Sequence, residues 1–180
     1  MTMRILLMIY FGFFLNERGL CQNTSHSIEN IKAYVKMVDS LSSIKTYLKI
    51  DKEEQVKLVL SLSEGTIEDK KRRLKGGFSV VTITNSDSDT VYSIQKHDNL
   101  EKNLYQSYYF QSDKLVFSRI ELKNDDDKND TLFLQEEYYA DNKMILSVID
   151  KSKLKKKYKW RTDIDHVASA YYYLMEFKKR

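Results

Sequence analysis

Proline is absent from the 180 residues of this sequence, glycine occurs five times, and cysteine occurs once, as Cys21. A single cysteine excludes an intramolecular disulfide and any zinc site that is built from several cysteines. The absence of proline excludes proline-rich recognition segments. The sequence contains 13 tyrosines and eight phenylalanines, many more than its five glycines. This balance favours aromatic-rich strands or helices with few tight glycine turns.

Several catalytic signatures are missing as well. The sequence has no Gly-x-Ser-x-Gly elbow, the turn that exposes the nucleophile of many hydrolases. Gly76-Gly77 lacks both the ending of a phosphate-binding loop and the spacing of a dinucleotide fingerprint. His26, His97 and His166 lie far apart and show no metal-ligand spacing. The sequence therefore assigns no catalytic residue, no metal ligand and no cofactor.

The remaining composition is that of a globular protein. Lysine and arginine number 30 against 26 acidic residues, which gives a formal net charge of +4, and 42% of the residues are hydrophobic. The length fits a single domain. A chain of this size buries roughly 68–70% of its unfolded surface, so it can fold without disulfides.

The first 21 residues have the pattern of a signal peptide. Arg4 supplies a positive charge, and Ile5–Leu15 is an apolar run of eleven residues, too short for the about 20 residues of a membrane-spanning helix. Gly19 and Cys21 place small residues at positions −3 and −1 of a cleavage site before Gln22. We therefore expect export to the periplasm or the cell exterior and a single mature domain over residues 22–180. A buried core helix and a lipid anchor on Cys21 are the alternatives, although the residues before Cys21 lack the pattern of a lipid anchor.

Two segments near the ends of the mature chain show helical periodicity. One is Ser27–Lys49, and the other begins at Thr162 or Asp163, where Thr162 and Asp165 have the spacing of a capping box. The apolar positions are Ile28, Ile31, Val35, Val38, Leu41 and Leu48 in the first segment, and Ile164, Val167, Ala168, Tyr171, Leu174 and Met175 in the second.

Strand patterns follow the first helical segment. Alternating residues over Val56–Leu62 predict a half-buried strand, which Ser63-Glu64-Gly65 should end. Gly76-Gly77 is the strongest turn signal in the chain. After it, Phe78–Thr84 and Thr90–Lys96 predict two further strands.

An internal repeat is the most informative pattern in the sequence. Gln106–Glu121 and Gln135–Asp150 match at a constant offset of 29 residues. Each copy contains an aromatic strand, a short polar turn that ends in lysine, and an apolar strand, which predicts a hairpin that occurs twice. Two copies are too few for a solenoid and fit a meander of neighbouring strands.

These patterns predict an α+β protein with an antiparallel β-meander sheet of about six to seven strands, an N-terminal helix and a C-terminal helix. Helices at the two ends of a meander can cover one face of the sheet, and the other face is then left for solvent or a partner.

The order of these features resembles that of a broad set of small exported β-meander proteins of Gram-negative bacteria. The resemblance covers about Ile28–Asp150, and it implies export and a meander without implying an activity. The residues that carry it are Ser63-Glu64-Gly65, Tyr108-Tyr109-Phe110 with Lys114-Leu115, and Tyr138-Tyr139 with Lys143-Met144.

An acidic loop and a basic stretch are the two charged features. Asp125, Asp127, Asn129 and Glu136 match four ligand positions of a calcium loop, but Asp130 stands where such a loop needs glycine. A solvated loop is therefore the alternative to a calcium site. The stretch Lys151–Arg161 suits anionic lipid head groups or polysaccharide, or it is a second solvated loop.

Four tyrosines of the repeat are candidate ligand-facing aromatics: Tyr108, Tyr109, Tyr138 and Tyr139. Neighbouring residues in a strand point to opposite faces, so Tyr108 and Tyr109 cannot lie in the same layer. One row packs against a helix. The other row is exposed to solvent, covered by the second helix, or part of a binding surface.

The sequence favours a non-enzymatic exported binding or interaction module, whose partner would be cell-envelope polysaccharide, lipid head groups or another exported protein, and no nucleic acid. This function predicts an exposed aromatic face or edge strand. An exported hydrolase is the alternative, and it predicts a pocket with two or more carboxylates or a histidine of shifted pKa. A calcium-dependent structural module is a third possibility. The ligand, the oligomeric state and the strand order are left open.

Overall fold

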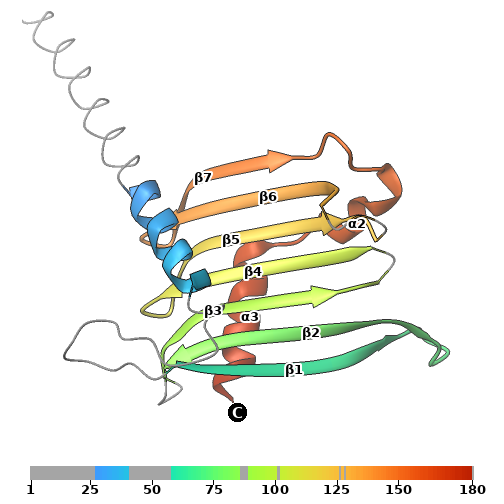
Figure 1. Ribbon diagram of the computed structural model, residues 1–180, viewed down its shortest axis with the longest axis horizontal. Helices are drawn as coiled ribbons and strands as arrows, with labels where there is room; N and C mark the ends of the chain where they lie inside the picture. The colour runs from blue at the N-terminus through green and yellow to red at the C-terminus, as the bar shows by residue number, and fades with distance from the viewer. Residues whose placement is uncertain are drawn as a thin grey trace, which may run out of the picture.

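Seven strands form one antiparallel sheet in the computed structural model, which describes residues 27–40, 58–85, 89–100, 102–125, 127 and 129–179. The sheet order is β1-β2-β3-β4-β5-β6-β7, so every strand pairs with its neighbour in the chain (Figure 1). The α+β meander is thereby confirmed. The strands are β1 (Leu58–Glu68), β2 (Leu74–Asn85), β3 (Val91–Asp98), β4 (Asn103–Gln111), β5 (Lys114–Lys123), β6 (Thr131–Ala140) and β7 (Lys143–Asp150).

Helices flank the sheet at both ends of the described chain. An N-terminal helix spans residues 27–40, and the C-terminal segment contains η1 (Lys156–Tyr158), α2 (Lys159–Thr162) and α3 (His166–Lys178). No helix within these described ranges is long and apolar enough to cross a membrane. The expected signal peptide, residues 41–49 of the expected first helix and the predicted strand start at Val56 lie outside the described residues.

The two long helices lie on opposite faces of the sheet, which corrects the expectation that both cover one face. In Figure 1 the N-terminal helix lies in front of the sheet and α3 passes behind it. Both faces need cover because neighbouring residues of β4 are large and apolar, and strand geometry sends them to opposite sides. Tyr108 packs with α3, whereas Tyr109 packs with the N-terminal helix.

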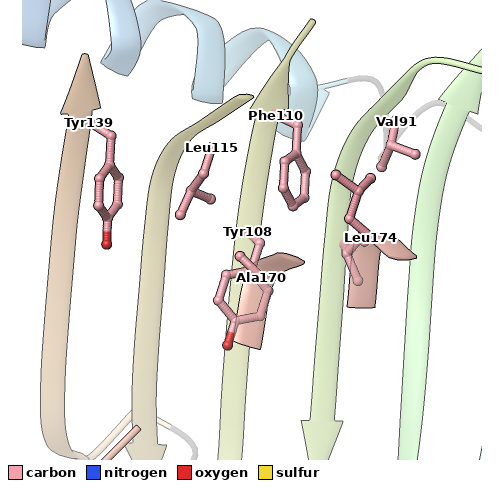
Figure 2. Packing of buried hydrophobic residues seen from close by; sticks show 8 residues of the cluster. Val91, Tyr108, Phe110, Leu115, Tyr139, Ala170 and Leu174 are labelled. Atoms are coloured by element: carbon pink, nitrogen blue, oxygen red, sulfur yellow. The ribbon is translucent and has the colours of Figure 1, made fainter. Parts of the chain in front are cut away.

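Each face has its own apolar core. Figure 2 shows the cluster beneath α3, where side chains of β3 to β6 pack against Ala170 and Leu174 of that helix. A third cluster lies under η1 and centres on Ile120 and Tyr158. Full burial of a large apolar side chain stabilises a fold by about 1.5–3 kcal/mol. The buried members of the cluster beneath the N-terminal helix are Val35, Val38, Ile83, Tyr109, Phe117 and Tyr138.

The predicted repeat is confirmed as two similar hairpins, β4–β5 and β6–β7. Their turns contain Ser112-Asp113 and Asp141-Asn142, and all four residues have positive φ angles between 49° and 61°. Such angles give the turn a twist that matches the twist of the paired strands. The strand register also shifts at equivalent places, directly after Tyr109 and directly after Tyr138.

The β1–β2 hairpin differs from the prediction. Ser63-Glu64-Gly65 does not end the strand, because Gly65 leaves room for the ring of Phe78 on the paired strand, and β1 continues to Glu68. Gly76-Gly77 lies inside β2 rather than in a turn. The turn is formed by Asp69–Arg73, where the Asp69 carboxylate accepts hydrogen bonds from the backbone N–H groups of residues 71 and 73.

A close contact, rather than a turn, explains why residues 76 and 77 are both glycine. Asn99, in the β3–β4 connection, accepts a hydrogen bond from the backbone N–H of Gly77 at 2.6 Å. A Cβ atom on Gly76 would lie 2.8 Å from the same Asn99 oxygen. These glycines therefore permit a close approach of two backbone segments.

The C-terminal helix begins later than predicted. Asp165 caps α3, and its carboxylate accepts a hydrogen bond from Ala168 N at 2.9 Å. Thr162 instead ends the short helix α2. The basic stretch before it is not simply a solvated loop, because it places Tyr158 and Arg161 in buried positions among exposed lysines.

The turn at Asp141-Asn142 gives a first prediction. Asn142→Val should lower the free energy of unfolding by about 1–2 kcal/mol, because a β-branched residue is strained at positive φ. Asn142→Gly should keep or raise stability, because glycine adopts this conformation readily. Urea denaturation of both variants measures the difference. Equal urea midpoints for Asn142→Val and Asn142→Gly would contradict the positive φ angle at Asn142.

Candidate ligand-binding groove

The four candidate tyrosines lie in the interior. Tyr108 is 0% exposed, Tyr109 is 3% exposed, and Tyr138 and Tyr139 are each 4% exposed. Tyr108 and Tyr139 are covered on the α3 side, and Tyr109 and Tyr138 are covered on the side of the N-terminal helix. The ligand-facing role that the sequence suggested for them therefore finds no open surface at these positions.

The hydroxyl groups of these tyrosines hold polar partners within the core. Tyr109 donates a hydrogen bond to Asp39 Oδ1 of the N-terminal helix at 2.6 Å, and Tyr108 donates one to Gln106 Oε1 at 2.9 Å. Burial raises the pKa of both phenols above the ordinary value. Burial also raises the pKa of Tyr138 to about 12, with the Glu136 carboxylate adding to the effect. These phenols are neutral hydrogen-bond donors near neutral pH.

A buried polar cluster lies where α3 begins. Ser118 Oγ and His166 Nδ1 are 2.6 Å apart, and Glu137 Oε2 lies 3.7 Å from the same nitrogen. Tyr139 also donates a hydrogen bond to Glu137. Burial lowers the pKa of His166, and the negative charges of Glu137 and Asp165 oppose this shift. The cluster combines a serine, a histidine and an acid, as hydrolases do.

The geometry of this cluster does not fit nucleophilic catalysis. A catalytic histidine contacts the serine through one ring nitrogen and the acid through the other. Here both oxygens face Nδ1, and His166 Nε2 has no partner within the described part of the chain. Ser118 is 0% exposed and His166 is 3% exposed, so no substrate reaches them. The cluster is a polar part of the core.

The acidic loop also has structural partners. Asp125 accepts hydrogen bonds from Lys102 and Asn103 at 3.0 Å each, and Glu136 pairs with Arg119 in the sheet. Asp130 pairs with Lys153 at 2.7 Å. The described residues contain no group of three or more His, Cys, Asp or Glu side chains that could hold a metal ion. Two of the side chains proposed as calcium ligands, Asp125 and Glu136, are thus paired with cations of the protein itself, and a third, Asp127, accepts a hydrogen bond from Asn129 N.

An apolar groove of about 360 Å³ lies between the C-terminal half of α3 and strands β1 to β3. Its volume is near the lower end of the roughly 300–1,000 Å³ of small-molecule sites. Ile67, Phe78 and Val80 contribute apolar lining from the strands, and Tyr172 and Phe177 contribute it from α3. Pockets of this kind, lined by apolar and aromatic side chains with a few polar groups, bind small organic molecules.

Small residues of β1 create this space. Ser61, Ser63 and Gly65 alternate along the strand and are half-buried, opposite Thr82, Val80 and Phe78 of β2. The larger Leu60 and Leu62 alternate with them and are 57% and 59% exposed. The expected half-buried strand is therefore present, but its more buried row is the serine row. Short side chains under the end of α3 leave the volume unfilled.

The polar groups of the groove are few. Lys96 of β3 and Glu176 of α3 are the charged side chains among the described residues that line it, and no histidine is among them. Glu176 Oε1 accepts a hydrogen bond from Lys179 Nζ at 2.8 Å. Tyr172, the groove residue of α3 that is nearest to His166 in sequence, lies six positions after it, which corresponds to roughly 9 Å along the helix. The groove and the histidine cluster are thus separate.

β1 and β7 are the edge strands of the described sheet. Met144, Val148 and Ile149 of β7 are between 43% and 56% exposed. Trp160, in the basic stretch, is 57% exposed. The Cζ atom of Arg161 lies over the Trp160 ring, 5.5 Å from the ring centroid. Neither feature is hollowed into a site in the way that the groove is.

Sequence reasoning did not find the groove. The signal that was present is the alternation of Ser61, Ser63 and Gly65 in β1, where short side chains occupy one face of the strand. Comparisons of the chain with models of protein families, with curated proteins and with solved structures gave no match. The groove must therefore be interpreted from its own chemistry.

The buried histidine predicts a pH dependence of stability. The unfolded chain binds a proton at His166 near pH 6.5, whereas the folded chain binds it only at lower pH. Between these values the unfolded state holds more protons, so the free energy of unfolding should fall as the pH falls below 6.5, by at most about 1.4 kcal/mol per pH unit.

Urea denaturation between pH 7.5 and pH 5 measures this slope. His166→Gln should reduce the slope of the free energy of unfolding against pH. His97→Gln removes a histidine outside the cluster, so it is the matched control and should leave the slope unchanged. A slope that is unchanged in His166→Gln would show that other groups cause the loss of stability.

Proposed function

We propose that the protein is an exported, non-enzymatic binding protein and that the groove between α3 and strands β1 to β3 holds a small apolar molecule. The observation that carries this proposal is the groove itself, a volume of about 360 Å³ lined by aromatic and aliphatic side chains. Burial of apolar surface is the main driving force for binding in such a site.

The distribution of acid–base groups favours binding over catalysis. A hydrolase of the kind considered above would need carboxylates or a histidine of shifted pKa within a pocket. The histidine of lowered pKa is His166, which is buried at the other end of α3. Glu176 is the only carboxylate among the described lining residues of the groove. A single carboxylate, which is already paired with Lys179, does not supply the two acid–base groups that such a hydrolase needs.

The apolar lining also favours one class of partner over the others that the sequence suggested. Polysaccharide would need hydrogen-bonding groups along most of its path. This groove has hydroxyl groups on its serine, threonine and tyrosine side chains, but the larger part of its exposed lining is apolar. A molecule with a long apolar part, of the kind that cell envelopes contain, fits the lining better.

The groove proposal is tested by filling the groove. Ser63→Trp should weaken binding of the uncharged fluorescent probe N-phenyl-1-naphthylamine by about tenfold or more, because the indole occupies the space that Ser63 leaves. Glu64→Trp adds the same side chain at the next position, on the exposed opposite face of β1, and is the matched control. Fluorescence titration measures both affinities.

Two results would reject the groove as the binding site. One is a wild-type protein that does not bind the probe, and the other is an equal loss of affinity in both tryptophan variants. Thermal denaturation of the two variants shows whether each is folded.

Export is tested separately, and it rests on Arg4 and the apolar run Ile5–Leu15. N-terminal sequencing of the mature protein, purified from outside the cytoplasm of a Gram-negative host, should give Gln22 as the first residue. A product that begins at Met1 would contradict the cleaved signal peptide, and a product that begins at a lipid-modified Cys21 would support the lipid anchor instead.

A further inference from the structure

We propose that the molecule held in the groove is an amphipathic acid, with an apolar chain and a single carboxylate that Lys96 binds. This inference rests on the proposed function, because it assigns the chemistry of the ligand for the same groove. Lys96 is the only cationic side chain among the described residues that line the groove.

Lys96 is positioned toward the groove by the sheet. It lies on β3 in the same cross-strand row as Val80 and Ser63, on the face that α3 covers. Its side chain is 21% exposed, and its Nζ lies 5.6 Å from the centre of the Tyr173 ring on α3. The ammonium group is therefore held beside apolar lining, where an anion would interact with it more strongly than in water.

The nearest acid does not use the hydrogen-bonding capacity of Lys96. Asp98 Oδ2 lies 3.7 Å from Lys96 Nζ, which is too long for a hydrogen bond. Asp98 is instead bound by Arg161, which is buried and forms both a hydrogen bond and an ion pair with it. Arg161 also donates to the backbone carbonyl of Lys102 at 3.2 Å. The core thus neutralises Asp98 with Arg161. The Lys96 ammonium group lies within ion-pair distance of Asp98 but beyond hydrogen-bond distance, and Lys96 lines a groove of mainly apolar groups.

The charges around Lys96 favour a monoanion. Asp98 lies beside it, and Glu176 lines the same groove. A carboxylate brings one negative charge, which this single lysine matches, whereas a phosphate monoester brings up to two negative charges. Phosphate sites also typically use arginine or several backbone N–H groups. The groove therefore suits a carboxylate better than a phosphate.

The volume sets the size of the apolar part. A groove of about 360 Å³, near the lower end of the roughly 300–1,000 Å³ of small-molecule sites, suits a ligand with one apolar chain of moderate length. Phe78, Val80 and Ile67 would contact the chain from the sheet, and Tyr172 and Phe177 from the helix.

The test uses three probes that share one apolar chain: decanoate, decan-1-ol and decyl phosphate. Each displaces N-phenyl-1-naphthylamine from the full chain at pH 7.5. Lys96→Met keeps the length and removes the charge of this side chain. It should weaken decanoate binding by about tenfold and change decan-1-ol binding by less than about twofold. Wild-type protein should bind decanoate more tightly than decyl phosphate.

The matched control is Lys143→Met, which removes the same charge from an exposed lysine at the start of β7, on the opposite edge of the sheet. It should leave all three affinities unchanged. Lys96→Arg keeps a positive charge, so it should retain most of the preference for decanoate over decan-1-ol. This variant also maintains the test if Lys96→Met proves unstable.

The outcomes separate this inference from the proposed function. An equal loss of decanoate and decan-1-ol in Lys96→Met, or an equal loss in Lys143→Met, would overturn the role of Lys96 and leave the apolar groove intact. Tighter binding of decyl phosphate than of decanoate would overturn the carboxylate. Failure of every probe, including N-phenyl-1-naphthylamine, to bind wild-type protein would reject the groove function itself.

Discussion

The burial of neighbouring aromatic residues on opposite faces of one sheet is the constraint on which the rest of the structure depends. Tyr108 and Tyr109 are adjacent in β4, and each is enclosed by a different helix. A strand cannot direct both rings to one side. The fold consequently needs a layer on each face, and the helices at the two ends of the meander supply these layers. This arrangement explains why an exposed aromatic surface does not form at the repeat.

The groove follows from where α3 is well packed and where it is not. Ala170 and Leu174 of the helix are buried against the central strands, next to Tyr108 and Phe110. Farther along, the helix crosses β1 to β3, where the facing row of β1 contains Ser61, Ser63 and Gly65. Short side chains cannot fill the space beneath the tyrosine and phenylalanine of the helix. The same helix therefore closes the core at one end and forms one wall of a groove at the other.

Buried polar groups play a different role from the groove. The Ser118–His166 contact and the Arg161–Asp98 ion pair lie under the C-terminal segment, and their partners come from distant parts of the chain. Breaking a buried ion pair by removing one partner typically destabilises a protein by about 3–5 kcal/mol. These pairs tie the C-terminal segment to the sheet, and Arg161 additionally leaves Lys96 available beside the groove.

The sequence by itself determined the local structure. The repeat at an offset of 29 residues predicted two hairpins with polar turns, and the periodicities predicted a meander with a helix at each end. These features depend on neighbours in the chain, so local patterns specify them. The prediction of a turn at Gly76-Gly77 was wrong. These glycines permit a close contact with Asn99, and Asn99 lies in the β3–β4 connection, which the local sequence around the glycines does not specify.

Only the tertiary structure decided which row of each strand a helix covers. The alternation in β1 defines a leucine row and a serine row, but either row could face a helix until the path of α3 is known. Lys96, Ser63 and Phe177 are far apart in the sequence and meet only where that helix crosses the sheet. A groove is defined by space between elements, and the sequence of one element contains no information on how closely another packs against it.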